Sequence, residues 1–312
     1  MSNAFVFPGQ GSQAVGMGKD LYDNFEEAKE VFDTVDEALG EKLSEVIFNG
    51  TQEELTKTTN AQPALLAMSM AVLKVLQMEK GVTVEDDADF VAGHSLGEYC
   101  ALCAAGSLSL TDAAKLLRLR GEAMERAVPN GLGGMAAVIG MTPSQVEEVV
   151  FEASEGEEVC VIANDNSDGQ IVVSGHANAI KRGEEIALDK GAKRYIVLPV
   201  SGPFHSPLMQ KAKEELTEAI MNTEIKAPVV PLIANVTASS ISDPEEIKKL
   251  LLEQITGQVR WRESVLYMGE NGVDRQIEIG AGKVLSGLVR RINREIKGVA
   301  LGSVEDIEKF EI

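Results

Sequence analysis

Short apolar runs alternate with longer, helix-length segments along this chain. Four of the short runs have the length of buried strands; they lie at 5–7, 89–92, 231–235 and 276–279. The segment 63–76 is too long for one strand, and its density of alanine, leucine and methionine predicts a core helix. Buried strands separated by helices are typical of a parallel sheet covered by helices. We therefore expect a parallel α/β core.

The middle of the chain has a different pattern. A turn-forming cluster, Pro-Asn-Gly-Leu-Gly-Gly, occupies 129–134. Six segments with strand or helix patterns follow it: strand 135–139, helix 143–152, strand 159–162, strand 170–174, helix 177–190 and strand 194–200. This β-α-β-β-α-β order is typical of a ferredoxin-like unit. We predict that 130–200 is a small ferredoxin-like subdomain inserted into a core formed by 1–129 and 201–312, with a substrate cleft between them.

One motif between a predicted strand and a predicted helix indicates chemistry. The residues after the run at 89–92 read Gly93-His-Ser-Leu-Gly97. A strand that enters a helix through Gly-x-Ser-x-Gly is a nucleophile elbow, which exposes the serine hydroxyl on a strained turn. We expect Ser95 to be a nucleophile in an α/β-hydrolase-like core, with the backbone amide of Leu96 beside it as an oxyanion donor. The alternative is a glycine-rich turn with no catalytic role.

A serine nucleophile needs a base, and histidine is the commonest one near neutral pH. The chain has three histidines. His94 is next to Ser95 on a sharp turn, where neighbouring side chains diverge, and His176 is at the start of a predicted helix. His205 lies on a proline-bracketed loop after a predicted strand, a common position for catalytic groups. We expect His205 to be the base, oriented by a backbone carbonyl because no acidic partner is evident.

Charge and cysteine content restrict the possible classes of function. A net charge of −20 argues against nucleic acid or an anionic membrane surface as a partner. The three cysteines have neither a metal-ligand pattern nor a disulfide framework, so we expect no metal and a cytoplasmic location. The chain has no signal-peptide pattern, and no uninterrupted apolar run reaches the roughly 18 residues of a membrane span.

Four separated motifs carry a family resemblance. They are Phe5-Val-Phe-Pro-Gly-Gln-Gly-Ser-Gln, Gly93-His-Ser-Leu-Gly-Glu-Tyr, Leu117-Arg-Leu-Arg-Gly and Gly202-Pro-Phe-His-Ser. In this order they resemble the malonyl-CoA:acyl carrier protein transacylases of bacterial fatty-acid synthesis, over essentially the whole chain. The resemblance implies ping-pong transfer of malonyl from malonyl-CoA to the phosphopantetheine thiol of acyl carrier protein. It implies an acyl-serine intermediate and no cofactor.

The resemblance also implies roles for individual residues around Ser95. The backbone amide of Gln10 joins that of Leu96 in the oxyanion hole, and Arg120 pairs with the free carboxylate of the malonyl group. On the residues alone two alternatives stay open. Arg120 could be a surface arginine paired with a nearby glutamate, Glu122 or Glu125, and the glycine-rich loop at 8–11 could hold a phosphate.

Further residues are assigned to the substrate pocket by resemblance. Phe204 limits the room for substituents on the α-carbon of the acyl group, which is the form expected for malonyl selectivity. Gln62 and Asn166, together with Asn164 and Gln170, match positions that line the entrance. The sequence departs from the family where Asp168 and Ala281 replace frequent prolines, and neither position touches the chemistry.

The expected partners are malonyl-CoA and acyl carrier protein, and a monomer is expected. Because coenzyme A and the carrier are both acidic, an enzyme with a net charge of −20 needs local basic patches to bind them. Two clusters are candidates, with solvated helix faces as the alternative: the first contains Lys181, Arg182, Lys190, Lys193 and Arg194, and the second contains Lys283, Arg290, Arg291 and Arg294.

Other functions would use the same residues. A discrete malonyl acyltransferase of a polyketide synthase would serve a different carrier, and a serine thioesterase or esterase would deliver the acyl group to water. A binding protein with a vestigial site would form no acyl-serine. The sequence does not distinguish the fatty-acid pathway from the polyketide pathway, and it does not identify the carrier or the cluster that docks it.

Overall fold

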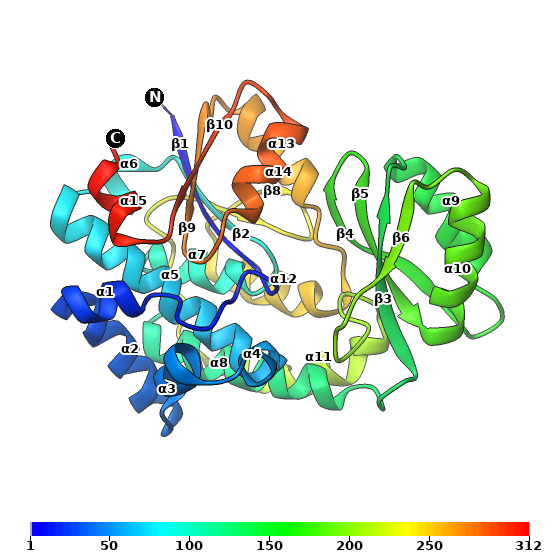
Figure 1. The fold of residues 1–312 in the computed structure, drawn as a ribbon, viewed down its shortest axis with the longest axis horizontal. Coiled ribbons are helices and arrows are strands. Elements are labelled where there is room, and N and C mark those ends of the chain that lie inside the picture. Colours follow the sequence, from blue (N-terminus) through cyan, green and yellow to red (C-terminus); the bar gives the residue numbers. More distant parts are fainter. Residues whose placement is uncertain (1, 312) are drawn as a thin grey trace.

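The computed structural model describes residues 2–311, which form a larger sheet with helices on both faces and a smaller sheet with helices on one face (Figure 1). Met1 and Ile312, at the outer ends of the predicted core ranges, lie outside the described residues. The larger sheet has the strand order β10-β9-β1-β2-β7-β8. Its strands are β1 (Asn3–Phe7), β2 (Phe90–Gly93), β7 (Leu232–Ala234), β8 (Ser239–Ile241), β9 (Arg275–Ile279) and β10 (Lys297–Leu301).

The strands from β10 to β7 are parallel, and β1 lies among them with every residue buried. Successive side chains of a strand point to opposite faces of its sheet. Phe5 and Phe7 therefore pack into the core beneath α5 and α8, whereas Ala4 and Val6 pack against α13 and α14. Burial on both faces explains why β1 is continuously apolar. At the edge, β8 pairs antiparallel with β7, which the sequence did not predict.

Helices cover both faces of the larger sheet (Figure 1). They are α1 (Lys19–Asn24), α2 (Glu26–Leu39), α3 (Leu43–Asn49), α4 (Gln52–Thr56), α5 (Thr58–Lys80), α6 (Val84–Asp87), α7 (Gly97–Ala104), α8 (Leu110–Arg126), the short 3₁₀ helix η1 (Pro207–Met209), α11 (Gln210–Asn222), α12 (Pro244–Thr256), α13 (Trp261–Glu270), α14 (Val284–Ile292) and α15 (Val304–Lys309). Of these, α5 is long and apolar enough to cross a membrane. Most of it is buried inside the protein, so it is the core helix predicted around 63–76.

The smaller sheet is antiparallel and has the order β4-β5-β3-β6. Its elements are β3 (Gly133–Ile139), α9 (Pro143–Ala153), β4 (Cys160–Ser167), β5 (Gln170–His176), α10 (Ala177–Asp189) and β6 (Arg194–Val197). The predicted β-α-β-β-α-β order is confirmed. Ala136 and Val138 of β3 pack against α9 and α10, while Met135 and Ala137 face the larger unit.

Two strand ends differ from the prediction by three residues or more, each for a physical reason. β4 continues beyond position 162 to Ser167 although asparagine and aspartate are poor strand formers. The Asp165 amide donates to the Val259 carbonyl, so the larger unit provides partners for this polar segment. β6 ends at Val197 because Pro199 has no amide hydrogen to continue the ladder. β10 was also not predicted.

Candidate active site

The turn between β2 and α7 has the geometry of a nucleophile elbow. Ser95 has φ 54°, a left-handed conformation that L-residues rarely adopt. The two glycines are required by close backbone approach. A Cβ on Gly93 would lie 1.9 Å from the Gly97 carbonyl group, and a Cβ on Gly97 would lie 2.3 Å from the Phe7 carbonyl oxygen. The motif therefore packs the elbow against the end of β1.

His205 lies directly at the Ser95 hydroxyl. Its Nε2 is 2.8 Å from Ser95 Oγ, and its Nδ1 is 2.7 Å from the backbone carbonyl oxygen of Gln254. A carbonyl oxygen can only accept, so Nδ1 carries the hydrogen and Nε2 is free to accept the serine proton. The expectation that a backbone carbonyl orients the imidazole is confirmed. Like Ser95, His205 has a positive φ, 56°, in the turn before η1.

The surroundings of His205 keep it neutral. Only 4% of the residue is exposed, and burial lowers its pKa to about 3, with a further lowering by the positive charge of Arg120. The hydrogen bond to the Gln254 carbonyl acts in the opposite direction. A neutral imidazole is the form that accepts a proton, so His205 is in its basic form at any physiological pH.

Arg120 reaches the same hydroxyl from α8. It donates from Nη2 to Ser95 Oγ at 3.0 Å and to Gln254 Oε1 at 2.9 Å, and from Nη1 to Gln62 Oε1 at 2.8 Å. Arg120 is 1% exposed and makes no ion pair with a carboxylate in residues 2–311. The alternative of a surface ion pair is therefore wrong for Arg120. It is Arg118, two residues earlier, that pairs with a surface glutamate, Glu41.

Gln62 was expected at the pocket entrance, and the structure places it elsewhere. It is 1% exposed, it is not among the residues that line the cavity described below, and its Oε1 accepts from Arg120. The reason is that a buried amide on an apolar helix needs a polar partner, and the Arg120 guanidinium provides it. Gln62 thus supports Arg120 from α5 and does not line the cavity.

Three buried polar residues that the sequence analysis missed connect these groups. Asn235, just after β7, accepts from the Ser95 amide at 2.8 Å and donates to the Gly93 carbonyl at 2.7 Å. Gln254 of α12 donates from Nε2 to the Ser95 carbonyl at 3.0 Å and to Glu98 Oε2 at 2.7 Å. Glu98 Oε2 also accepts from the backbone amide of Asn235 at 3.2 Å. They hold both sides of the elbow in place.

A cavity of about 390 Å³ opens onto Ser95 and His205 between the two sheets. The larger unit contributes Gln10, His94 and Phe204 to its lining. The smaller unit contributes Asn164, Asn166 and Gln170 and an apolar wall formed by Met135, Ala137 and Val172. The predicted cleft between the two units is therefore present, and of the residues expected to line it, Phe204, Asn164, Asn166 and Gln170 do so.

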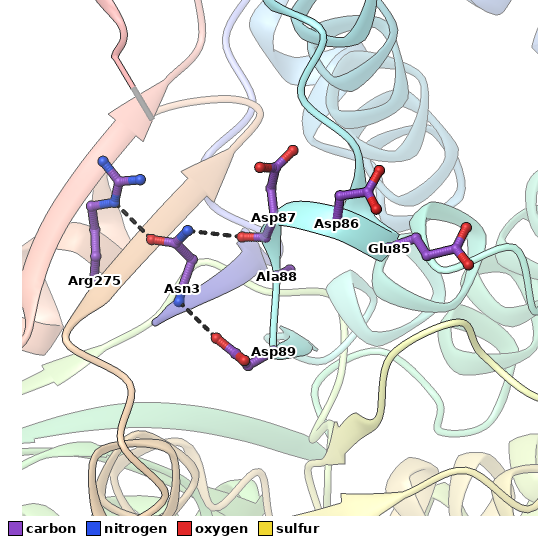
Figure 2. A pocket seen from close by; sticks show the side chains of 7 residues that line it. All are labelled: Asn3, Glu85, Asp86, Asp87, Ala88, Asp89 and Arg275. Atoms are coloured by element: carbon purple, nitrogen blue, oxygen red, sulfur yellow. Dashed lines mark hydrogen bonds between the residues drawn. The ribbon is translucent and has the colours of Figure 1, made fainter. Parts of the chain in front are cut away.

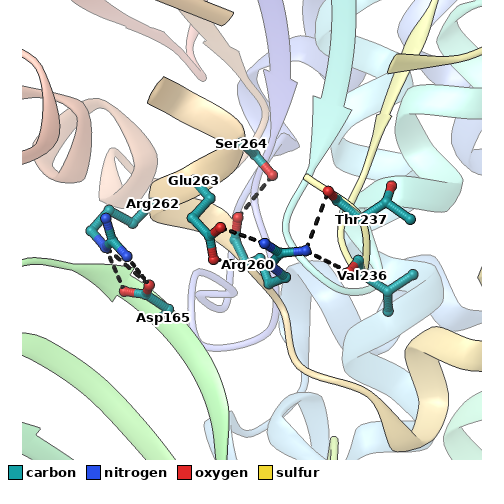
Figure 3. A network of polar contacts seen from close by, with 7 residues as sticks. All are labelled: Asp165, Val236, Thr237, Arg260, Arg262, Glu263 and Ser264. Atoms are coloured by element: carbon teal, nitrogen blue, oxygen red, sulfur yellow. Dashed lines mark hydrogen bonds and ion pairs between the residues drawn. The ribbon is translucent and has the colours of Figure 1, made fainter. Parts of the chain in front are cut away.

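Polar contacts fix the smaller unit against the elbow. Asn166 Oδ1 lies 2.8 Å from Nε2 of His94, the residue before Ser95. The neighbouring Asp165 accepts from Arg262 at the start of α13, through Nε at 2.9 Å and Nη2 at 2.8 Å (Figure 3). Asp165 is almost fully buried, so this pair forms a shielded connection between β4 and the larger unit.

A second pocket lies at the opposite end of the strands (Figure 2). There Asn3 donates to the Asp87 carbonyl at 2.8 Å and accepts from Arg275 at 2.8 Å. This is the amino end of β1, whereas Ser95 follows the carboxyl end of β2. Ligands of open parallel sheets bind at the carboxyl ends of the strands, so the chemistry belongs to the cavity at Ser95.

The two basic clusters differ in their surroundings. In the first, Arg182 pairs with Glu158 and Lys190 pairs with Glu148 and Glu152. In the second, the exposed side chains of α14 and its flanks make no ion pair in residues 2–311, and Arg291 donates to Gln170 at 3.1 Å. Since Gln170 lines the cavity, Arg291 places one end of the second cluster next to it.

His176 lies away from Ser95 and bonds to the backbone of the smaller unit. It is the residue before α10, and its Nδ1 accepts from the Val159 amide at 3.0 Å. Within residues 2–311, no group of three or more histidine, cysteine, aspartate or glutamate side chains is arranged to hold a metal ion.

Comparisons with known proteins agree with this geometry. Residues 4–309 match the family model described as the acyl transferase domain. The chain is 50% identical over 305 residues to the malonyl CoA-acyl carrier protein transacylase of Bacillus subtilis, covering 98% of this chain and 95% of that protein. It superposes with a TM-score of 0.96 on the acyl-carrier-protein S-malonyltransferase of Bartonella henselae, at 55% identity and with 99% and 98% of the two chains covered. A malonyl-transacylase solved with its type II polyketide synthase acyl-carrier protein is 37% identical, with a TM-score of 0.95 and 99% and 98% coverage.

Proposed function

The chain belongs to the acyl transferase family, among its malonyl-CoA–acyl carrier protein transacylases, and we propose that Ser95, His205 and Arg120 carry out its reaction. The enzyme is an acyltransferase that moves a malonyl group from malonyl-CoA to the phosphopantetheine thiol of acyl carrier protein. Malonyl-CoA and the carrier are its partners.

One observation carries the assignment of substrate: within residues 2–311 the buried Arg120 contacts no carboxylate, and its Nη2 lies 3.0 Å from Ser95 Oγ. In malonyl-serine the free carboxylate carbon is three bonds of about 1.5 Å from Ser95 Oγ. The Arg120 guanidinium is thus within reach of that carboxylate, and a planar guanidinium holds a carboxylate through two parallel hydrogen bonds. A buried unpaired cation is costly, so an anionic substrate group is the partner that this site is built to receive.

The proposed reaction begins with the Ser95–His205 pair. His205 Nε2 takes the hydroxyl proton as Ser95 Oγ bonds to the thioester carbonyl carbon. The carbon–sulfur bond of malonyl-CoA then breaks, and the proton on His205 passes to the departing sulfur, releasing coenzyme A as a thiol. The carrier thiol repeats these steps in reverse: it gives its proton to His205, attacks the malonyl ester and frees Ser95.

The developing oxyanion needs donors, and we propose the backbone amides of Leu96 and Gln10. Leu96 is the residue before α7, so its amide lies at the positive end of that helix. Gln10 lines the cavity beside Ser95. In the described part of the chain neither amide donates to another residue, which supports their use by a ligand. We also propose that Phe204 restricts acyl substituents, since it is buried at the cavity wall beside His205.

The test of the carboxylate assignment is Arg120→Ala. Removing one partner of a buried charge pair costs about 2–5 kcal/mol, so kcat/KM for malonyl-CoA should fall at least about thirtyfold. Acetyl-CoA, which has no carboxylate, should lose far less. Arg120→Lys should recover only part of the loss because an ammonium cannot reproduce the two-point contact. The measurement is kcat/KM for both substrates in each variant.

The matched control for this test is Arg118→Ala. Arg118 is on the same helix and donates to Asn60 and Glu41 away from the cavity. The Arg118→Ala substitution should leave the malonyl-to-acetyl ratio of kcat/KM unchanged. If Arg120→Ala and Arg120→Lys also keep the parent ratio, Arg120 is a structural residue and the carboxylate assignment fails.

We propose that the carrier docks on the α14 cluster, Lys283, Arg290, Arg291 and Arg294. In the described part of the chain these four side chains make no ion pair, and Arg291 contacts Gln170, which lines the cavity. In the first cluster Lys181 and Arg182 lie on α10, which packs on the face of the smaller sheet opposite to the cavity wall. An acidic carrier therefore meets unpaired positive charge where its thiol must enter.

Charge reversal at Arg290 and Arg291 tests this docking surface. The malonyl-enzyme is preloaded, and its discharge is followed with carrier protein or with a small neutral thiol such as N-acetylcysteamine. Arg290→Glu with Arg291→Glu should slow discharge to the carrier about tenfold or more at low salt and leave small-thiol discharge unchanged. Lys181→Glu with Lys193→Glu is the control on the first cluster. Equal slowing by both pairs, or none by either, would reject the α14 surface.

The finer description of the fold is also a proposal: an α/β-hydrolase-like core, 1–129 and 201–312, with a ferredoxin-like subdomain at 130–200. The antiparallel order β4-β5-β3-β6 supports the second part. We further propose a cytoplasmic enzyme of fatty-acid synthesis that needs no cofactor. Its three free cysteines suit a reducing compartment. A panel of fatty-acid and polyketide carrier proteins would distinguish the two pathways.

A further inference from the structure

Glu98 is a buried carboxylate that the proposed reaction does not use. It lies in the first turn of α7, the helix that follows the motif, and only 1% of the residue is exposed. Its Oε2 accepts from the Gln254 side chain at 2.7 Å and from the backbone amide of Asn235 at 3.2 Å. Both donors are neutral and neither is a counter-ion. A carboxylate is expensive to bury without an opposite charge, so its retention here needs a reason.

The nearest opposite charge is Arg120, and one side chain connects the two. Gln254 Oε1 accepts from Arg120 Nη2 at 2.9 Å, while Gln254 Nε2 donates to Glu98. Glu98 and the Arg120 guanidinium are thus connected through a single side-chain amide, without direct contact between the two charges. The charged and titratable side chains that face Glu98 are Arg120 of α8 and Tyr99 of α7 itself. The segment after β7 and helix α12 contribute the neutral Asn235 and Gln254.

We propose that Glu98 is a specificity-determining residue that takes up a proton when the substrate carboxylate reaches Arg120, so that one guanidinium never serves two buried carboxylates. This inference rests on the proposed pairing of the malonyl carboxylate with Arg120. Glu98 touches neither substrate nor reacting atoms, and it acts through Gln254 and through its charge.

The ionisation of Glu98 supports this coupling. Burial raises the pKa of Glu98 to about 7, against the lowering effect of Gln254, Asn235 and Arg120. Burial also raises the pKa of Tyr99 to about 12, so Tyr99 stays neutral in the same range. Below pH 7 Glu98 is neutral and Arg120 is free for the malonyl carboxylate. Above pH 7 Glu98 is ionised, and the malonyl group must drive proton uptake, so its affinity falls as pH rises.

The experiment compares kcat/KM for malonyl-CoA and acetyl-CoA between pH 6 and pH 9. In the parent enzyme the malonyl-to-acetyl ratio should fall as the pH rises from 6 to 9. The total fall should be about tenfold for each pKa unit by which malonyl binding raises the pKa of Glu98. Glu98→Gln keeps an oxygen to accept both hydrogen bonds but has no charge. Its ratio should stay at the low-pH value of the parent enzyme throughout. Contributions from His205 affect both substrates alike and cancel in the ratio.

Two further variants separate charge from structure. Glu278→Gln changes another fully buried glutamate, which accepts from the amides of Leu285 and Ser286, and it should keep the pH-dependent ratio of the parent enzyme. Glu98→Ala removes the acceptor as well as the charge and should lower kcat for both substrates. A parent ratio that is flat with pH, or a Glu98→Gln ratio that falls like that of the parent, overturns the proposal.

A binding measurement covers the case in which Glu98→Gln does not fold. Malonyl-CoA is titrated calorimetrically into Ser95→Ala at pH 8 in two buffers with different ionisation enthalpies. Uptake approaching one proton is expected for malonyl-CoA and none for acetyl-CoA; no uptake for malonyl-CoA overturns the proposal. If Arg120→Ala leaves selectivity unchanged, the proposed function fails first. If Arg120→Ala removes selectivity but no proton is taken up, only the role of Glu98 fails.

Discussion

Ser95→Ala incubated with malonyl-CoA should keep its original mass, whereas the parent protein should gain one malonyl group. The reason is that Ser95 Oγ is the atom that His205 and Arg120 both contact, at 2.8 and 3.0 Å. Transfer to the carrier should fall by about 10⁴-fold or more, as for other catalytic serines. Intact-protein mass spectrometry and a carrier malonylation assay provide the two readouts.

The control for this variant is Ser201→Ala. Ser201 is an exposed serine that contacts Thr58 Oγ1 at 3.0 Å. Its replacement should leave the malonyl adduct in place. Alanine adopts the left-handed conformation at position 95 with about as much strain as serine, so the folded state should be preserved. A malonyl adduct that persists in Ser95→Ala, mapped by peptide digestion to another residue, would disprove the nucleophile.

His205→Ala should lower the rate of acylation by about 10²–10⁴-fold, the usual contribution of a general base. The imidazole is the only group placed to take the Ser95 proton in the described structure, because Arg120 donates to the same oxygen. Single-turnover acylation by malonyl-CoA, followed by rapid quench, measures the effect. His176→Ala is the control and should change the rate by less than about twofold, since the His176 side chain accepts from the Val159 amide just before α10 and does not line the cavity.

The pH dependence gives an independent check on His205. A pKa of about 3 means that the neutral base persists well below the ordinary histidine range. Acylation by acetyl-CoA should therefore be nearly constant from pH 8 to pH 5, where a histidine of ordinary pKa would lose about thirtyfold. Equal losses in His205→Ala and His176→Ala, or an acid limb near pH 6.5, would contradict the assignment.

The sequence predicted those parts of the site that lie in local patterns. The elbow follows from two glycines around Ser95, because only glycine permits the backbone approach at 93 and 97. His205 was predicted from its position on a loop between two prolines. A backbone carbonyl was expected as the partner of its imidazole. Which carbonyl it would be could not be predicted, because Gln254 is 49 residues away and meets His205 only in the folded chain.

The site residues that were not predicted are polar side chains within apolar stretches of the sequence. Gln254 lies on the buried stripe of α12 that also contains Ile247, Leu250, Leu251 and Ile255, and one amide in such a stripe is a signal that was not used. Asn235 ends a buried strand run, the place where ligand-side residues of parallel sheets gather. Glu98 stands at the start of the apolar helix α7. Each would have indicated a buried network, although its partners depend on tertiary packing.

The residues that line the cavity come from both sheets. Substitutions on the smaller sheet can therefore change the acyl pocket separately from the catalytic groups, which lie on the larger unit. The groups that we propose for bond making and breaking come from the larger unit, whereas Met135, Ala137 and Val172 of β3 and β5 form an apolar wall with no group that can transfer a proton. The Asp165–Arg262 connection holds that wall at a fixed distance from the elbow. Substitutions in the wall can therefore reshape the space for the acyl group while the catalytic groups stay in register, so new acyl donors can be accepted without rebuilding the nucleophile.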